Sequence, residues 1–226
     1  MAAARARPER PRAMTPSYWA EAIRALAARD PVFAPLIERC PVLAVGSRGD
    51  AFQTLSRAIV GQQISVKAAS SVWSKFSARL GVVTPAAVCS CRRPSLRACG
   101  LSTQKTAYLK DLAVRFADGS LDPAGWRELD DETLIAQLTQ VKGIGRWTAE
   151  VFLIFYLGRP DVLPLADLGI QRAMRLNYGR GRALSEARMR RIGATWAPWR
   201  SVAAWYMWRS LDAVPVALPN GGPDEA

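Results

Sequence analysis

Apolar residues recur at helical spacing along almost the whole chain, and no segment alternates apolar and polar residues well enough to predict a strand. The breaks between periodic segments carry residues typical of helix caps rather than of hairpin turns. We therefore predict an all-α fold. The expected helices cover residues 17–29, 31–39, 51–60, 65–80, 103–117, 131–140, 146–157, 168–177, 185–194 and 198–211, with short turns at 85–90 and 94–98 and a short helix opened by Asp122 and Pro123.

The segment 146–157 (RWTAEVFLIFYL) is apolar on nearly every side, whereas a surface helix keeps a polar stripe. We expect it to be the central buried helix. Its purely apolar run is about a third of the length that a bilayer-spanning helix needs. The expected location is therefore the cytoplasm, with association to the nucleoid if the source is bacterial.

Charge points towards a polyanionic partner. The chain has 31 Lys and Arg against 19 Asp and Glu, a net charge of +12, and a pI near 10.3, which is typical of nucleic-acid binders. An arginine-rich composition can also come from a GC-rich genome, so charge alone leaves the partner open. Residues 1–14 carry four arginines and two prolines and predict a disordered basic arm, either a dispensable leader or a DNA-gripping tail.

Histidine is absent from the sequence. This excludes Ser-His-Asp hydrolysis, Cys-His proteolysis and most zinc catalysis, and it leaves Asp, Glu, Lys or Tyr as a general base. Cysteines 40, 89, 91 and 99 lack paired C-x-x-C spacing. We interpret them as small buried or incidental residues.

The strongest local signal is the segment 138–149 (LTQVKGIGRWTA), two helices joined by a Gly-Ile-Gly hairpin, here called the hairpin. Gly143 and Gly145 allow a sharp turn and a close approach to a phosphate. Gly145 also begins a helix, whose amides can point at an anion beside Lys142 and Arg146. The segment predicts a contact with the DNA backbone, and the alternative is an ordinary corner between helices.

Asp167 lies in the segment 163–172 (LPLADLGIQR), where a loop enters a helix. Taken alone, it is best interpreted as a helix N-cap, because an aspartate there accepts hydrogen bonds from free amides of the next turn.

The combination of parts has a more specific meaning. The hairpin, the buried helix, Asp167 and Trp196–Arg200 (WAPWR) together resemble the helix-hairpin-helix DNA glycosylase superfamily, in its 3-methyladenine DNA glycosylase II branch. The likeness runs from about Asp50 to Ser210 and includes Ala58–Ser65 (AIVGQQIS). It implies that Asp167 is the catalytic aspartate.

We expect two interlocked helical subdomains with a cleft between them. The terminal subdomain would comprise residues 15–49 and 160–213, and the central subdomain residues 50–159 with the hairpin. Residues 214–226 would be a flexible tail.

The resemblance also separates mechanisms. Strand-nicking members of the superfamily carry a lysine nucleophile where this sequence has Trp147, and a tryptophan cannot form a Schiff base. No cysteine follows Cys99, so the iron–sulfur cluster of some relatives has no ligands. The expected enzyme is monofunctional and needs no cofactor, apart from a monovalent cation that the hairpin carbonyls could hold.

The base pocket and the wedge also come from the resemblance. Trp147 and Trp208 are the expected pocket residues, with Trp205 and Tyr206 as weaker candidates, and Val151 stands where the branch can have a pocket tyrosine. The matching segment also makes Gln62 and Gln63 candidates for the wedge that fills the gap left by an extruded base, the alternative being a polar linker between helices.

The implied function is a monofunctional, monomeric DNA glycosylase. It would flip alkylated bases such as 3-methyladenine out of double-stranded DNA and hydrolyse the N-glycosidic bond, leaving an abasic site for base excision repair. Asp167 would stabilise positive charge on the sugar and orient the water. Two alternatives remain, a non-catalytic helix-hairpin-helix module that binds DNA and a glycosylase for oxidised or mismatched bases.

Overall fold

The structure is a computed structural model that describes residues 15–40 and 50–211. The regular elements in these ranges are all helical, as the apolar periodicity predicts. They are α1 (Trp19–Arg29), α2 (Phe33–Arg39), α3 (Ala51–Gly61), α4 (Val66–Leu80), α5 (Pro85–Ser90), α6 (Arg93–Arg97), α7 (Thr103–Ala117), a 3-10 turn (Pro123–Gly125), α8 (Asp131–Leu138), α9 (Arg146–Phe152), a π-helical turn (Leu153–Leu157), α10 (Leu168–Tyr178), α11 (Glu186–Ala194) and α12 (Arg200–Arg209).

Side-chain caps explain where many of these helices begin. The oxygen of a Ser, Thr or Asp just before the helix accepts a hydrogen bond from an amide of the first turn, which otherwise lacks a partner. The carboxylate of Asp50 accepts from the amide of Gln53 at 2.8 Å, and the hydroxyl of Ser102 accepts from that of Lys105 at 3.1 Å. The same arrangement occurs at Ser65, Thr84, Asp130, Asp167 and Ser185.

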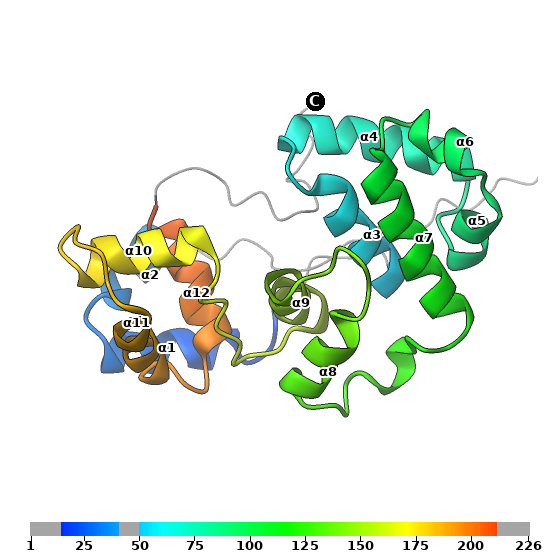
Figure 1. Cartoon of the computed structure of the whole chain (residues 1–226). Coiled ribbons are helices and arrows are strands. Elements are labelled where there is room, and N and C mark those ends of the chain that lie inside the picture. The colour runs from blue at the N-terminus through cyan, green and yellow to red at the C-terminus, as the bar shows by residue number, and fades with distance from the viewer. Residues whose placement is uncertain (1–14, 41–49, 212–226) are drawn as a thin grey trace, which may run out of the picture.

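The helices form two groups with α9 between them (Figure 1). In one group α12 packs against α1, α2 and α10, and in the other α7 packs against α3 and α5. The predicted arm at 1–14 and tail at 214–226 lie outside the described residues, as does part of the chain between α2 and α3. The subdomain boundaries therefore stay a prediction.

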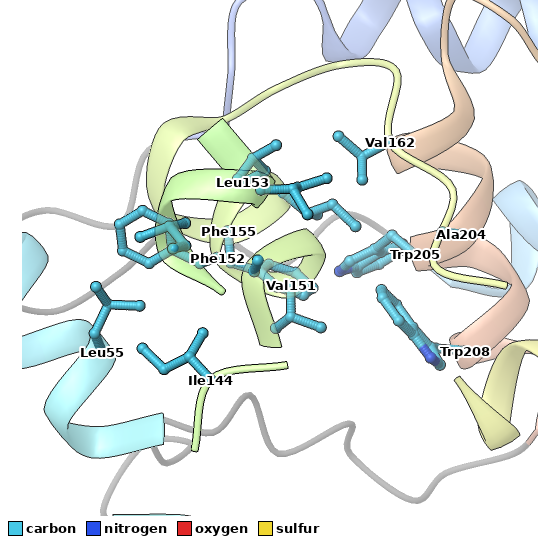
Figure 2. Packing of buried hydrophobic residues seen from close by; sticks show 14 of the residues in the cluster. Leu55, Ile144, Val151, Phe152, Leu153, Phe155, Val162, Ala204, Trp205 and Trp208 are labelled. Carbon is cyan, nitrogen blue, oxygen red and sulfur yellow. The ribbon is translucent and has the colours of Figure 1, made fainter. Parts of the chain in front are cut away.

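The buried segment 146–157 is not one regular α-helix, and here the prediction was wrong in detail. It is α-helical to Phe152, continues as a π-helical turn from Leu153 to Leu157, and ends at Gly158 with a positive φ of 68°. Apolarity on every side cannot distinguish these two hydrogen-bond patterns, since both bury the same residues. Figure 2 shows its apolar side chains lying between Leu55 and the tryptophans of α12.

No helix in the described ranges is long and apolar enough to span a membrane. All four cysteines are free thiols, with Cys40 and Cys99 buried and the other two half-buried. The residues that the structure describes contain no cluster of three or more acidic, Cys or His side chains suited to a metal ion.

Candidate functional site

Asp167 is bound by groups from three helices. Its Oδ1 accepts a hydrogen bond from the amide of Ile170 at 2.8 Å, which caps α10. The same oxygen accepts from the indole Nε1 of Trp208 at 2.8 Å. Its Oδ2 accepts from the indole Nε1 of Trp147 at 2.7 Å. The expected cap is therefore present, and the same carboxylate also holds both tryptophans predicted for the base pocket.

The two tryptophans differ in exposure. Trp208 lies in α12, is only 6 % exposed, and packs against Phe155 with ring centroids 5.7 Å apart. Trp147 is the second residue of α9 and is 42 % exposed. Trp208 is therefore a rigid support for the carboxylate, whereas the ring of Trp147 is open to solvent and to a ligand.

The charge of Asp167 is hydrogen-bonded but not neutralised. Its side-chain partners are neutral indole N–H groups, and in the described part of the chain it forms no ion pair with a Lys or Arg. Donors of this kind fix the orientation of a carboxylate. The site thus presents an oriented negative charge beside an exposed aromatic face.

Gly169 lies against this arrangement, and sequence reasoning missed it. A Cβ built there would lie 2.9 Å from Oδ1 of Asp167 and 3.1 Å from Cδ1 of Trp208. Only glycine leaves room for the bond between them. The available signal was a glycine in the first turn of a helix, where its low helix propensity needs a reason.

The hairpin turn packs against α7. Gly143 has a φ of +84°, and a Cβ there would lie 2.1 Å from the ring of Tyr108 in α7. The amide of Lys142 donates to Oδ2 of Asp111, also in α7, at 2.9 Å. The side chain of Lys142 is exposed. The turn is thus fixed to α7 while its lysine remains at the surface.

The first turn of α9 has no side-chain cap, because its N-cap residue is Gly145. A Cβ on Gly145 would find no atom within 4 Å, so the backbone is open there. Free amides and an open approach are what a phosphate needs at a helix start.

The side chain of Arg146 binds acidic residues, whereas the sequence predicted that it would lie beside a DNA phosphate. Its guanidinium binds Glu132 of α8 at 2.5 and 2.8 Å and Glu150 of α9 at 2.9 Å. Glu150 is only 5 % exposed, and burial raises the pKa of its carboxyl while the charge of Arg146 opposes the rise. In this structure the Arg146 side chain links two helices, which leaves its backbone amide for the predicted DNA contact.

The two candidate wedge residues are placed differently. The side-chain amide of Gln62 donates to the carbonyl oxygen of Gly143 at 2.7 Å and so joins the end of α3 to the hairpin. Gln63 has a φ of 58° and an exposed side chain. Lys105 fixes the same segment by donating to the carbonyl of Val60 at 2.8 Å.

The weaker pocket candidates lie in the core. Tyr206 is fully buried, and Trp205 packs edge-on against Trp19 with centroids 5.5 Å apart. Val151 is buried too, so it adds little surface beside Trp147.

Comparison with known proteins finds similar chains among DNA glycosylases. A curated relative, DNA-3-methyladenine glycosylase 1 of Schizosaccharomyces pombe, is 35% identical over 163 residues, which are 70% of this chain and 72% of the relative. A DNA-3-methyladenine glycosidase from Bacillus halodurans superposes with a TM-score of 0.78 at 32% identity, over 88% of this chain and 92% of that one. A 3-methyladenine DNA glycosylase of S. pombe, solved in complex with abasic DNA, gives 0.73 at 30%, over 86% and 98%.

The family model of HhH-GPD superfamily base excision DNA repair proteins matches residues 56–198, which include the hairpin and Asp167. Together with these relatives, the match confirms both the resemblance drawn from the sequence and its 3-methyladenine DNA glycosylase branch. The chain belongs to the HhH-GPD superfamily of base excision DNA repair proteins.

Proposed function

We propose that this protein is a monofunctional DNA glycosylase that removes alkylated bases such as 3-methyladenine from double-stranded DNA. The observation that carries the proposal is the carboxylate of Asp167, held by two indole N–H groups beside the exposed ring of Trp147. The names of the relatives point to the same substrate class.

The chemistry follows from the charge of the site. An N-alkylated purine is cationic and already a good leaving group, so no proton donor is needed. As the N-glycosidic bond breaks, positive charge develops on the sugar. An ionised carboxylate at a fixed position stabilises that charge and can orient the attacking water. Asp167 has this orientation before DNA binds, because Trp208 and the amide of Ile170 hold Oδ1.

Trp147 would receive the extruded base. The face of a tryptophan attracts a cationic ring by about 0.5 to 2 kcal/mol, which favours alkylated over normal bases. The indole N–H of Trp147 donates to Oδ2 of Asp167, so a base stacked on this ring would lie beside the carboxylate. Trp147 cannot attack the sugar covalently, so water is the nucleophile and an abasic site is the product.

The hairpin and the end of α3 would hold the duplex. Lys142 and the open amides at Gly145 are positioned to bind a backbone phosphate. Gln63, exposed and in a left-handed conformation, is the better wedge. Gln62 is a tether, since its bond to Gly143 keeps the wedge in register with the hairpin.

Alkylated duplex DNA tests the proposal. We expect the wild-type protein to release free methylated purines and to leave strands that break only after alkali treatment. If no alkali-labile sites form, the chain is a non-catalytic DNA-binding module. Strand breaks without alkali would contradict a monofunctional mechanism.

A further inference from the structure

Half of the protein's net positive charge lies in one short stretch after the catalytic aspartate. Residues 168–191, from α10 to α11, contain seven arginines and one acidic residue, Glu186, so their net charge is +6 out of +12 for the chain. Glu186 is itself paired with Arg190 within α11. The function proposed above uses none of these arginines.

Two of them line a pocket. Arg172 and Arg175 of α10 border a cavity of about 360 Å³, which is completed by Leu168, Gln171, Ala183, Leu184 and Met189. No acidic residue lines this cavity. Gln171 is held in place by donating to the carbonyl of Leu165 at 2.8 Å. The charged side chains that line the pocket are therefore both cationic.

Both arginines lack a counter-ion within the described part of the chain. Arg172 and Arg175 are exposed and form no ion pair or side-chain hydrogen bond with the residues that the structure describes. Arginines that support the fold behave differently, since Arg146 binds Glu132 and Glu150, and Arg200 binds Asp161 at 2.7 Å. Unpaired guanidinium groups converging on one pocket favour an external anion.

The two arginines lie on the same face of α10 as its first residue, Leu168. Leu168, Arg172 and Arg175 are spaced i, i+4 and i+7, and Leu168 is 80 % exposed. At a rise of about 1.5 Å per residue, the arginines lie roughly 7.5 and 12 Å along the helix from Asp167. One strand of a duplex rises about 3.4 Å per nucleotide, so this span covers about two to four nucleotides.

We propose that Arg172 and Arg175 form a second DNA-backbone site, which binds phosphates of the lesion-containing strand about two to four nucleotides from the sugar that Asp167 faces. The inference rests on the proposed glycosylase function. The forked guanidinium matches the oxygens of a phosphodiester. The hairpin holds the duplex from α9 and this site from α10, so the target sugar is fixed between them.

The salt dependence of binding tests the number of phosphate contacts. The double variant R172Q/R175Q is compared with wild type on a duplex that carries a stable abasic-site analogue. Each lost phosphate contact makes the negative slope of log K against log salt shallower by about 0.9, so we expect its magnitude to decrease by about 1 to 2. The matched control is R93Q/R97Q, two exposed arginines with i, i+4 spacing on α6, at the opposite end of the molecule (Figure 1). An unchanged slope in R172Q/R175Q overturns the proposal.

A scan of the DNA backbone, carried out with wild type and with R172Q/R175Q, locates the contact. Single neutral methylphosphonate linkages are placed along the lesion strand of the same duplex. We expect linkages two to four nucleotides from the abasic site, on one side, to weaken wild-type binding but not binding by R172Q/R175Q. Equally weakened DNA binding by wild type and variant would overturn the proposed site. Unchanged DNA binding by wild type would overturn it too, and this is the result expected if the surface binds an acidic protein instead. The proposed function fails by a separate result, namely no base release by wild type.

Discussion

At the scale of single residues, Asp167 combines two roles that the sequence could not separate. It caps α10, as its local context predicts, and it also accepts one hydrogen bond from each of two tryptophans that are distant in sequence. The family resemblance identified Asp167, Trp147 and Trp208. It did not predict their mutual hydrogen bonds or the role of Gly169, because these depend on how α9, α10 and α12 pack.

Gly169→Ala should separate stability from activity. Alanine is favoured over glycine inside a helix by roughly 0.5–1 kcal/mol, but its Cβ would press on Oδ1 of Asp167 and on Trp208. We expect base release to fall at least tenfold, while the thermal midpoint stays close to that of wild type. Single-turnover release and thermal unfolding measure the two effects. Wild-type release by this variant would show that the orientation of the carboxylate does not matter.

At the scale of elements, α9 connects the hairpin to Asp167. Its first turn carries Trp147 and the open amides, and its apolar continuation packs against α12 (Figure 2). Periodicity and caps predicted nearly every helix because both are local. The π-helical turn, the pairing of Arg146 with Glu132, and the bond from Gln62 to Gly143 arise from contacts between elements, on which local patterns carry no information.

Gln63→Ala tests the wedge. A shortened side chain cannot fill the gap left by an extruded base, so we expect slower base release from duplex DNA, by roughly tenfold. Release from single-stranded alkylated DNA should be unchanged, because no stack has to be opened. Gln62→Ala is the comparison, since it breaks the tether to the hairpin and should weaken DNA binding. Equal slowing of Gln63→Ala on both substrates would exclude a wedge role.

At the scale of the whole molecule, the arginines differ in whether they pair with acidic side chains. Arg146 pairs with Glu132 and Glu150, and Arg200 with Asp161, whereas the arginines of α10 are exposed and form no ion pair with the described residues. The cavity bordered by Arg146, Glu150, Asp161 and Arg200 has a volume of about 470 Å³ and lies where the helix groups meet. Glu150 is one of the residues that line it, and its Oε2 is buried and has no hydrogen-bond partner among the described residues.

This buried carboxyl should be visible in the pH dependence of stability. Burial raises the pKa of Glu150 above its ordinary value of 4.5. Because the native state then binds the proton more tightly than the unfolded state, Glu150 reduces stability as pH rises from about 4.5 through the raised pKa. We expect Glu150→Gln to remove this loss. The thermal midpoint of the variant, measured relative to that of wild type, should rise from pH 4 to pH 8. A constant difference would contradict the raised pKa.

We expect Asp167 to act by its negative charge. Asn is as good an N-cap as Asp, so Asp167→Asn keeps the start of α10 and removes that charge, together with the acceptor for the indole N–H of Trp147. Single-turnover release of 3-methyladenine from duplex DNA is the direct measurement, with binding to abasic duplex as the control. We predict release at least about a hundredfold slower than wild type and binding that is no weaker. Release at the wild-type rate would show that the charge of Asp167 is dispensable.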